Sequence, residues 1–144
     1  MRIWLLLSYK IAPKPTANRV YIWRKLKRLG ALLLHDAVWV LPSSPRTQEQ
    51  FQWLAAEIGE LGGEALLWES RLTLAAQDEA LAQQFAAQTD EAYQKILMTL
   101  KRKGADLAAL SRQYQQVNTA DHFQSALGQQ VREALMAARG GHDT

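Results

Sequence analysis

The chain has 144 residues, of which 48% are hydrophobic and 22% are charged, a composition that is typical of one globular domain and excludes wholesale disorder. It contains no cysteine, which excludes disulfides, thiolate zinc sites and a cysteine nucleophile. The net charge is only +3, but residues 1–46 hold nine Lys/Arg and one acid, whereas residues 47–94 hold nine acids and one base. This polarity predicts a basic surface on the first third of the chain.

The apolar run at residues 3–7 is too short for a signal peptide or a membrane span. We therefore expect a cytoplasmic protein without membrane contact. The same run is rich in residues that favour a strand, and it stops before Pro13 and Pro15. It predicts a buried strand.

A helix is predicted from Thr16 to about residue 29, with Gly30 directly after its end. Two short apolar runs around Asp36 predict a hairpin. A capping box at residues 47–50 opens a second helix, and residues 64–72 form a fourth strand. The order strand-helix-strand-strand-helix-strand predicts an α+β class, with a ferredoxin-like antiparallel sheet whose helices cover one face.

From Gln77 onward the composition changes to Ala, Gln and Leu. The apolar spacing predicts helices over residues 77–100, after a cap at Asp106, and over about 122–138. We therefore expect a ferredoxin-like subdomain at residues 1–74 and an appendage of two or three helices at residues 75–144. Together they are expected to form one compact domain.

The first predicted helix carries a dense cluster of cations. Such groups contact successive DNA phosphates, and arginine adds bidentate geometry. The alternative is that Arg24 and Arg28 pair with acids of the second helix or the fourth strand, which are Glu49, Glu57, Glu60 or Glu69. The candidate DNA-binding residues are Arg19, Arg24, Lys25, Lys27 and Arg28.

No pattern predicts catalysis, a metal site or a cofactor. The three histidines (His35, His122 and His142) lack metal-ligand spacing, and the glycines form no phosphate loop. The serines lie in no nucleophile motif. Asp78 and Glu79 are expected to be solvated acids near a helix start. The five tryptophans fall one per predicted element, which favours core packing over a base-stacking platform.

The block from Tyr21 to Pro42, "YIWRKLKRLGALLLHDAVWVLP", is followed by "FQWLAAEIGELGGEALLWES" from Phe51. Together they resemble the N-terminal domain of the ChrB family of chromate-resistance regulators, and the resemblance extends from about Trp4 to Val131. Residues 19–42 are more weakly similar to the ferredoxin-like domain of PaaX-type repressors and to CRISPR adaptation nucleases of that fold. Such nucleases place an acidic metal ligand at the end of the first strand, where this chain has Ser8, Tyr9 and Lys10. We therefore expect no enzymatic activity.

The resemblance implies a transcriptional regulator of a chromate efflux operon that binds DNA. We expect homodimerisation to double the basic helix. A second domain normally follows in this family. Two alternatives stay open: a protein–protein interaction module, and an oxyanion-binding accessory protein that acts with a separately encoded ChrB C-terminal half.

Overall fold

The computed structural model describes residues 1–36 and 38–140. It divides into two compact units, Met1–Ala80 and Leu81–Thr144. Each unit has its own core and is described separately. Among the described residues, no helix combines the length and the apolar character that crossing a membrane requires.

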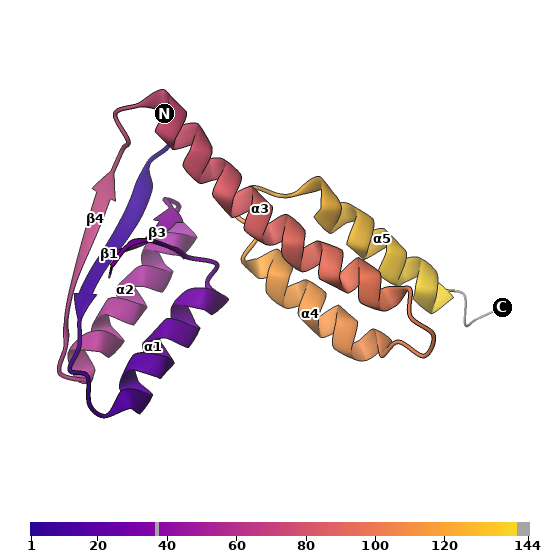
Figure 1. Cartoon of the computed structure of the whole chain (residues 1–144), viewed down its shortest axis with the longest axis horizontal. Helices are drawn as coiled ribbons and strands as arrows, with labels where there is room; N and C mark the ends of the chain where they lie inside the picture. Colours follow the sequence, from indigo (N-terminus) through magenta and orange to yellow (C-terminus); the bar gives the residue numbers. More distant parts are fainter. Residues whose placement is uncertain (37, 141–144) are drawn as a thin grey trace. The chain divides into compact units, whose positions relative to one another are not determined.

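The first unit contains a four-stranded sheet and two helices (Figure 1). In chain order the elements are β1 (Trp4–Lys10), α1 (Thr16–Arg28), β2 (Leu32–His35), β3 (Val38–Pro42), α2 (Pro45–Glu60) and β4 (Glu64–Ser70). The strands lie in the order β2-β3-β1-β4, and every neighbouring pair is antiparallel. The expected α+β class with an antiparallel sheet is confirmed.

The register of β1 decides which side chains share a face of the sheet. Leu7 lies opposite Trp39, and Leu5 lies opposite Glu69. Residues directly opposite each other point to the same side, so the odd-numbered residues of β1 and β4 share one face. The helix α2 covers this face, because its Gln48 amide donates a 2.9 Å hydrogen bond to Glu69. Leu5, Leu7 and Trp39 are buried there.

The helix α2 begins at Pro45, one turn closer to its preceding strand than the sequence predicts. Its N-cap is Ser44, whose hydroxyl oxygen accepts from the Thr47 backbone N–H at 3.1 Å. Thr47 completes the capping box, since its own hydroxyl oxygen accepts from the Ser44 N–H at 2.9 Å. The helix then buries Phe51, Leu54 and Ile58. The predicted capping box is therefore wrong in position, because Thr47 occupies N3 and not the cap.

The second unit is a helical bundle. It contains most of α3 (Ala75–Leu100) together with α4 (Leu107–Thr119) and α5 (Ala126–Gly140). Asp106 caps α4 as predicted, accepting from the Ala109 N–H at 3.1 Å. The helix α5 begins four residues later than predicted, after a turn in which Gln124 has φ +53°. The bundle core consists of Tyr93, Ile96, Leu110, Val131 and Leu135.

Candidate nucleic-acid interface

The helix α1 buries two of its side chains. Ile22 and Leu26 are both fully buried, and they lie one turn apart on one side of the helix. The helix ends at Arg28 with Leu29 as its C-cap, and Gly30 follows with φ +79°, a conformation that glycine adopts without steric cost. Because α1 is held along one stripe only, its opposite side faces solvent.

Three of the five candidate cations occupy that opposite side. Arg24, Lys27 and Arg28 are exposed. A helix turns about 100° per residue, which places these three side chains in one continuous arc away from Ile22 and Leu26. In the described part of the chain, none of the three lies in an ion pair with an acid. We call Arg24, Lys27 and Arg28 the outer basic face.

Lys25 behaves differently from its neighbours. Its Nζ atom lies 3.7 Å from Glu57 Oε1 of α2 and 5.4 Å from the centre of the Tyr21 ring. The Tyr21 hydroxyl donates a 2.6 Å hydrogen bond to the other oxygen of Glu57. An acid of the second helix therefore pairs with Lys25 and, among the described residues, not with Arg24 or Arg28 as the alternative expected.

Arg19 lies apart from the outer basic face. It lines a groove of about 340 Å³ with Tyr9, Thr16, Val20 and Trp23. Burial raises the pKa of the Tyr9 hydroxyl, and the positive charge of Arg19 opposes this shift. Arg19 and Arg28 are nine residues apart, so they project from nearly opposite sides of the helix. The five predicted residues thus fall into three groups, of which one is a continuous cationic surface.

The prediction that all five tryptophans pack in the core is wrong for three of them. Trp4 and Trp39 are 1% and 4% exposed, but Trp23, Trp53 and Trp68 are 51%, 66% and 53% exposed. The sequence contained a signal for Trp53, since it lies about 100–160° around α2 from Phe51, Leu54 and Ile58. Assigning each tryptophan to an element did not test which side of the element it occupied.

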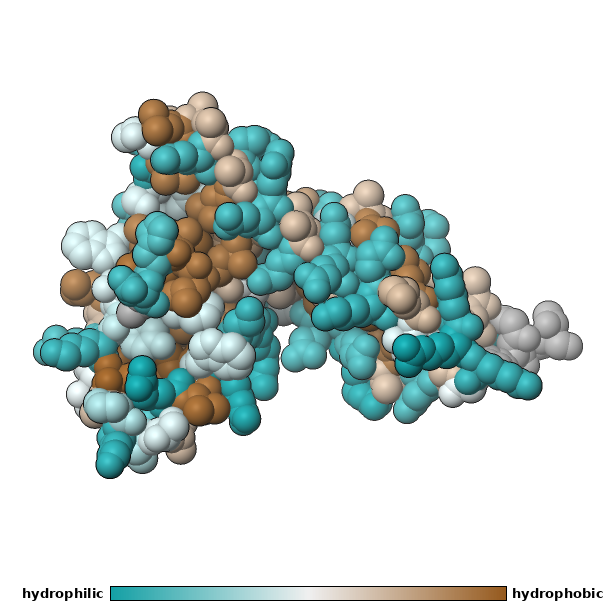
Figure 2. Space-filling view, in the orientation of Figure 1, coloured by the Kyte–Doolittle hydropathy of each residue, from teal (hydrophilic) through white to brown (hydrophobic). Residues whose placement is uncertain are grey.

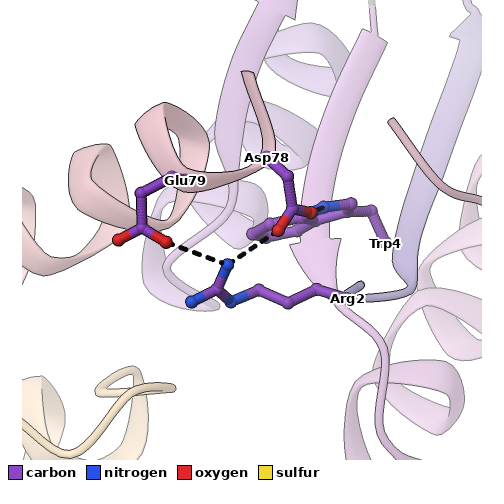
Figure 3. Close-up of polar contacts among 4 residues, drawn as sticks. All are labelled: Arg2, Trp4, Asp78 and Glu79. Atoms are coloured by element: carbon purple, nitrogen blue, oxygen red, sulfur yellow. Dashed lines mark hydrogen bonds and ion pairs between the residues drawn. The ribbon is translucent and has the colours of Figure 1, made fainter. Parts of the chain in front are cut away.

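Asp78 is also not the solvated acid that the sequence predicts. It is buried, and it accepts a 2.9 Å hydrogen bond from the Trp4 indole and a 2.7 Å hydrogen bond from Arg2 (Figure 3). Glu79 is exposed and lies 3.5 Å from the same Arg2 nitrogen. The Trp4 hydrogen bond, together with Arg2, lowers the pKa of Asp78 despite its burial. This cluster connects the start of α3 to β1 within the first unit.

The remaining chemistry-bearing residues do not assemble into a metal centre. The described residues contain no group of three or more His, Asp or Glu side chains that could hold a metal ion. His122 lies beside the ring of Phe85, with ring centroids 6.2 Å apart. His35 is exposed at the end of β2, and His142 lies outside the described residues.

One further polar groove lies in the second unit, between α4 and α5. Its volume is about 280 Å³. Arg139 donates a hydrogen bond to the Ser111 hydroxyl across this groove. Arg132 and Arg139 line one side, and Ser111, Tyr114 and Asn118 line the other. Two guanidinium groups beside hydroxyl and amide donors suit an oxyanion. Sequence reasoning missed this groove because its residues come from two separate helices.

The fold and the outer basic face define the class of this chain: an α+β sheet unit that presents a cationic helix, followed by a helical unit. The family described as "Protein ChrB, N-terminal" matches residues 19–116, from α1 into α4. The chain belongs to this family, and the resemblance drawn from the sequence is confirmed.

A curated relative is Protein ChrB of Cupriavidus metallidurans (strain ATCC 43123 / DSM 2839 / NBRC 102507 / CH34). It is 33% identical to this chain over 60 residues, which make up 42% of this chain and 18% of that protein. The match therefore covers less than a fifth of the relative's length. No solved structure matches the chain significantly.

Proposed function

We propose that this chain is a non-enzymatic, DNA-binding part of a chromate-resistance regulator, and that it holds the duplex through the outer basic face. The observation that carries the proposal is the exposure of Arg24, Lys27 and Arg28 without acidic partners in the described residues. Family membership supports the regulatory role. The order β1-α1-β2-β3-α2-β4 and the antiparallel sheet support a ferredoxin-like interpretation of the first unit.

The geometry suits contact with the DNA backbone more than readout of base edges. Arg24 and Arg28 are separated by one turn, about 6 Å along the helix axis. Lys27 lies between them along the axis and at one end of the same arc. Phosphate contacts by three cations release condensed counterions, so the affinity should fall steeply with salt. The last turn of α1 carries the basic residues Lys25, Lys27 and Arg28, of which Lys25 pairs with Glu57 of α2.

The test compares the salt dependence of binding to a promoter fragment for the parent and for an Arg24→Ala/Arg28→Ala variant. We expect the slope of log K against log salt to decrease in magnitude by about 2. The matched control is Arg71→Ala/Arg112→Ala, which removes the same charge from two exposed arginines outside α1. Equal slopes for the two variants would show that the charge of the whole chain, and not the outer basic face, determines binding.

The groove between α4 and α5 supports a second candidate function, oxyanion binding. Arg132 and Arg139 flank it, and both could donate bidentate hydrogen bonds to a tetrahedral anion. Calorimetry with chromate and with sulfate on the parent and on Arg132→Gln tests this candidate. A titration with no heat for either anion rejects it, and heat that is lost in Arg132→Gln supports it.

A further inference from the structure

The sheet of the first unit has two edges of very different character. At one edge, β2 has only four residues, and its register with β3 shifts between Leu33 and His35. At the other edge, β4 has seven residues and pairs with β1 along its whole length without irregularity. Since β4 is the last strand in the order β2-β3-β1-β4, no strand of the sheet pairs with its outer side. Its outward N–H and C=O groups can therefore accept another strand.

The strand β4 carries two charged side chains, Glu64 and Glu69, but it lacks two other features that usually prevent such pairing. Its sequence, EALLWES, contains no lysine and no proline, two residues that commonly protect sheet edges. None of its residues is buried, and Leu66 and Trp68 are 58% and 53% exposed. Leu66 and Trp68 lie opposite Ser8 and Leu6 of β1, on the face that the helix α2 does not cover. The edge is thus both open and apolar.

We propose that β4 pairs antiparallel with β4 of a second copy of this chain, which extends the sheet to eight strands across a two-fold axis. In such a pair, opposite residues lie on the same face. The helix-covered faces of the two copies lie on the same side of the extended sheet only when even-numbered β4 residues of one copy lie opposite even-numbered β4 residues of the other. This condition selects registers that are centred on one residue, either Leu66, Leu67 or Trp68.

The sequence of β4 favours the register centred on Leu67. Only this one of the three registers pairs all seven residues of both strands. It sets Leu66 opposite Trp68 of the second copy, an aliphatic–aromatic pair of the kind that stabilises sheets. It also sets Glu64 opposite Ser70 and Glu69 opposite Ala65, so no carboxylate faces another carboxylate. This self-complementarity argues for a second copy as the occupant, in preference to an unrelated strand.

Cysteine cross-linking tests both the interface and its register, because the parent has no cysteine. In the proposed register the Cα atoms of the two Leu67 residues lie about 4.5–5.5 Å apart, within the range of a disulfide. We expect Leu67→Cys to form a disulfide-linked dimer under mild oxidation. Leu66→Cys and Trp68→Cys should each fail to cross-link alone, since like residues are then about 8 Å apart. An equal mixture of these two variants should cross-link.

Sedimentation equilibrium gives an independent measurement without oxidation. We expect the parent to show a concentration-dependent dimer and Trp68→Lys to be monomeric. The matched control is Trp53→Lys, which places the same charge on another exposed tryptophan, in α2, and should leave the dimer intact. Circular dichroism verifies that both variants are folded.

Three results would overturn the proposal. They are a parent that is monomeric at every concentration, a dimer that persists in Trp68→Lys, or a Leu67→Cys variant that cross-links no faster than Trp53→Cys. Cross-linking of Leu66→Cys alone or of Trp68→Cys alone would overturn the register centred on Leu67.

Discussion

The two units differ in what they do with their polar and aromatic side chains. The first unit leaves Trp23, Trp53 and Trp68 largely exposed, and its outer basic face has no acidic partner in the described residues. Figure 2 shows teal and brown surface side by side over this unit. The second unit turns its large ring inward, because Tyr93 is fully buried. Asp121 accepts a 2.9 Å hydrogen bond from the Tyr93 hydroxyl.

The polar groups of the second unit mostly serve its own fold. Asp121 also accepts from the Ser125 backbone N–H at 3.0 Å, and the Ser125 hydroxyl bonds to Asp90. These contacts connect α3 to the turn before α5. The comparison indicates that the first unit carries the exposed tryptophans and the outer basic face, whereas the second unit contains an internal network of hydrogen bonds around Tyr93. Substitutions in this network should therefore lower the stability of the second unit, whereas substitutions of the exposed tryptophans and cations of the first unit should mainly affect association.

The largest expected effect on stability comes from Tyr93→Ala. Removing a buried aromatic ring leaves a cavity and lowers the free energy of unfolding by roughly 3–5 kcal/mol. All five tryptophans lie in residues 1–80, so tryptophan fluorescence reports on the first unit alone. We expect the urea midpoint measured by circular dichroism to decrease more than the midpoint measured by fluorescence. Equal decreases by both probes would show that the units unfold together and would weaken the comparison.

A substitution at Gly128 is expected to change the free energy of unfolding by a smaller amount, and the direction of the change is informative. A Cβ atom at this position would lie 2.8 Å from the Tyr93 hydroxyl oxygen and 2.9 Å from the ring carbon that bears it. A glycine in a helix usually costs stability relative to alanine, but here Gly128→Ala should lower the free energy of unfolding by about 1–3 kcal/mol through overpacking.

The control for this sign is Gly59→Ala in α2, where an added Cβ meets no atom within 4 Å. This substitution should raise the free energy of unfolding by about 0.5–1 kcal/mol. Urea denaturation of both variants measures the two effects. A stabilised Gly128→Ala variant would contradict the close approach of α5 to Tyr93.

The smallest expected effect is a pH dependence of the stability of the first unit. The folded state lowers the pKa of Asp78 below its ordinary value of 3.8, so the folded chain binds this proton less readily than the unfolded chain does. The stabilisation is complete above about pH 4 and is lost as the pH falls through the folded pKa. Asp78→Asn should be less stable than the parent at pH 7, and the difference should shrink below pH 4.

Urea midpoints by tryptophan fluorescence between pH 7 and pH 3 measure this difference. Glu79→Gln is the matched control, because Glu79 contacts the same Arg2 nitrogen from an exposed position. We expect little change in that variant. A difference between Asp78→Asn and the parent that is constant with pH would show that packing, and not ionisation, causes the loss.

Local signals in the sequence predicted the elements well. The cap at Asp106, the glycine after α1 and the hairpin around Asp36 depend on residues that lie next to one another in the chain. The burial of Asp78 was not predictable in this way, because its partner Trp4 lies 74 residues away. The separation of Lys25 from the outer basic face likewise depends on Glu57, which belongs to another helix. Charge counting located the basic helix but did not separate Lys25 from the outer basic face.

The irregular register of β2 has a consequence for how far assembly can proceed. A chain with two equally receptive sheet edges can add copies at both ends without limit and form a fibre. Here the four residues and the shifted register of β2 make that end a poor template. Association through β4 uses the receptive edge of both copies at once. Growth should therefore stop at a closed pair, and high concentration should yield a defined stoichiometry and not polymers.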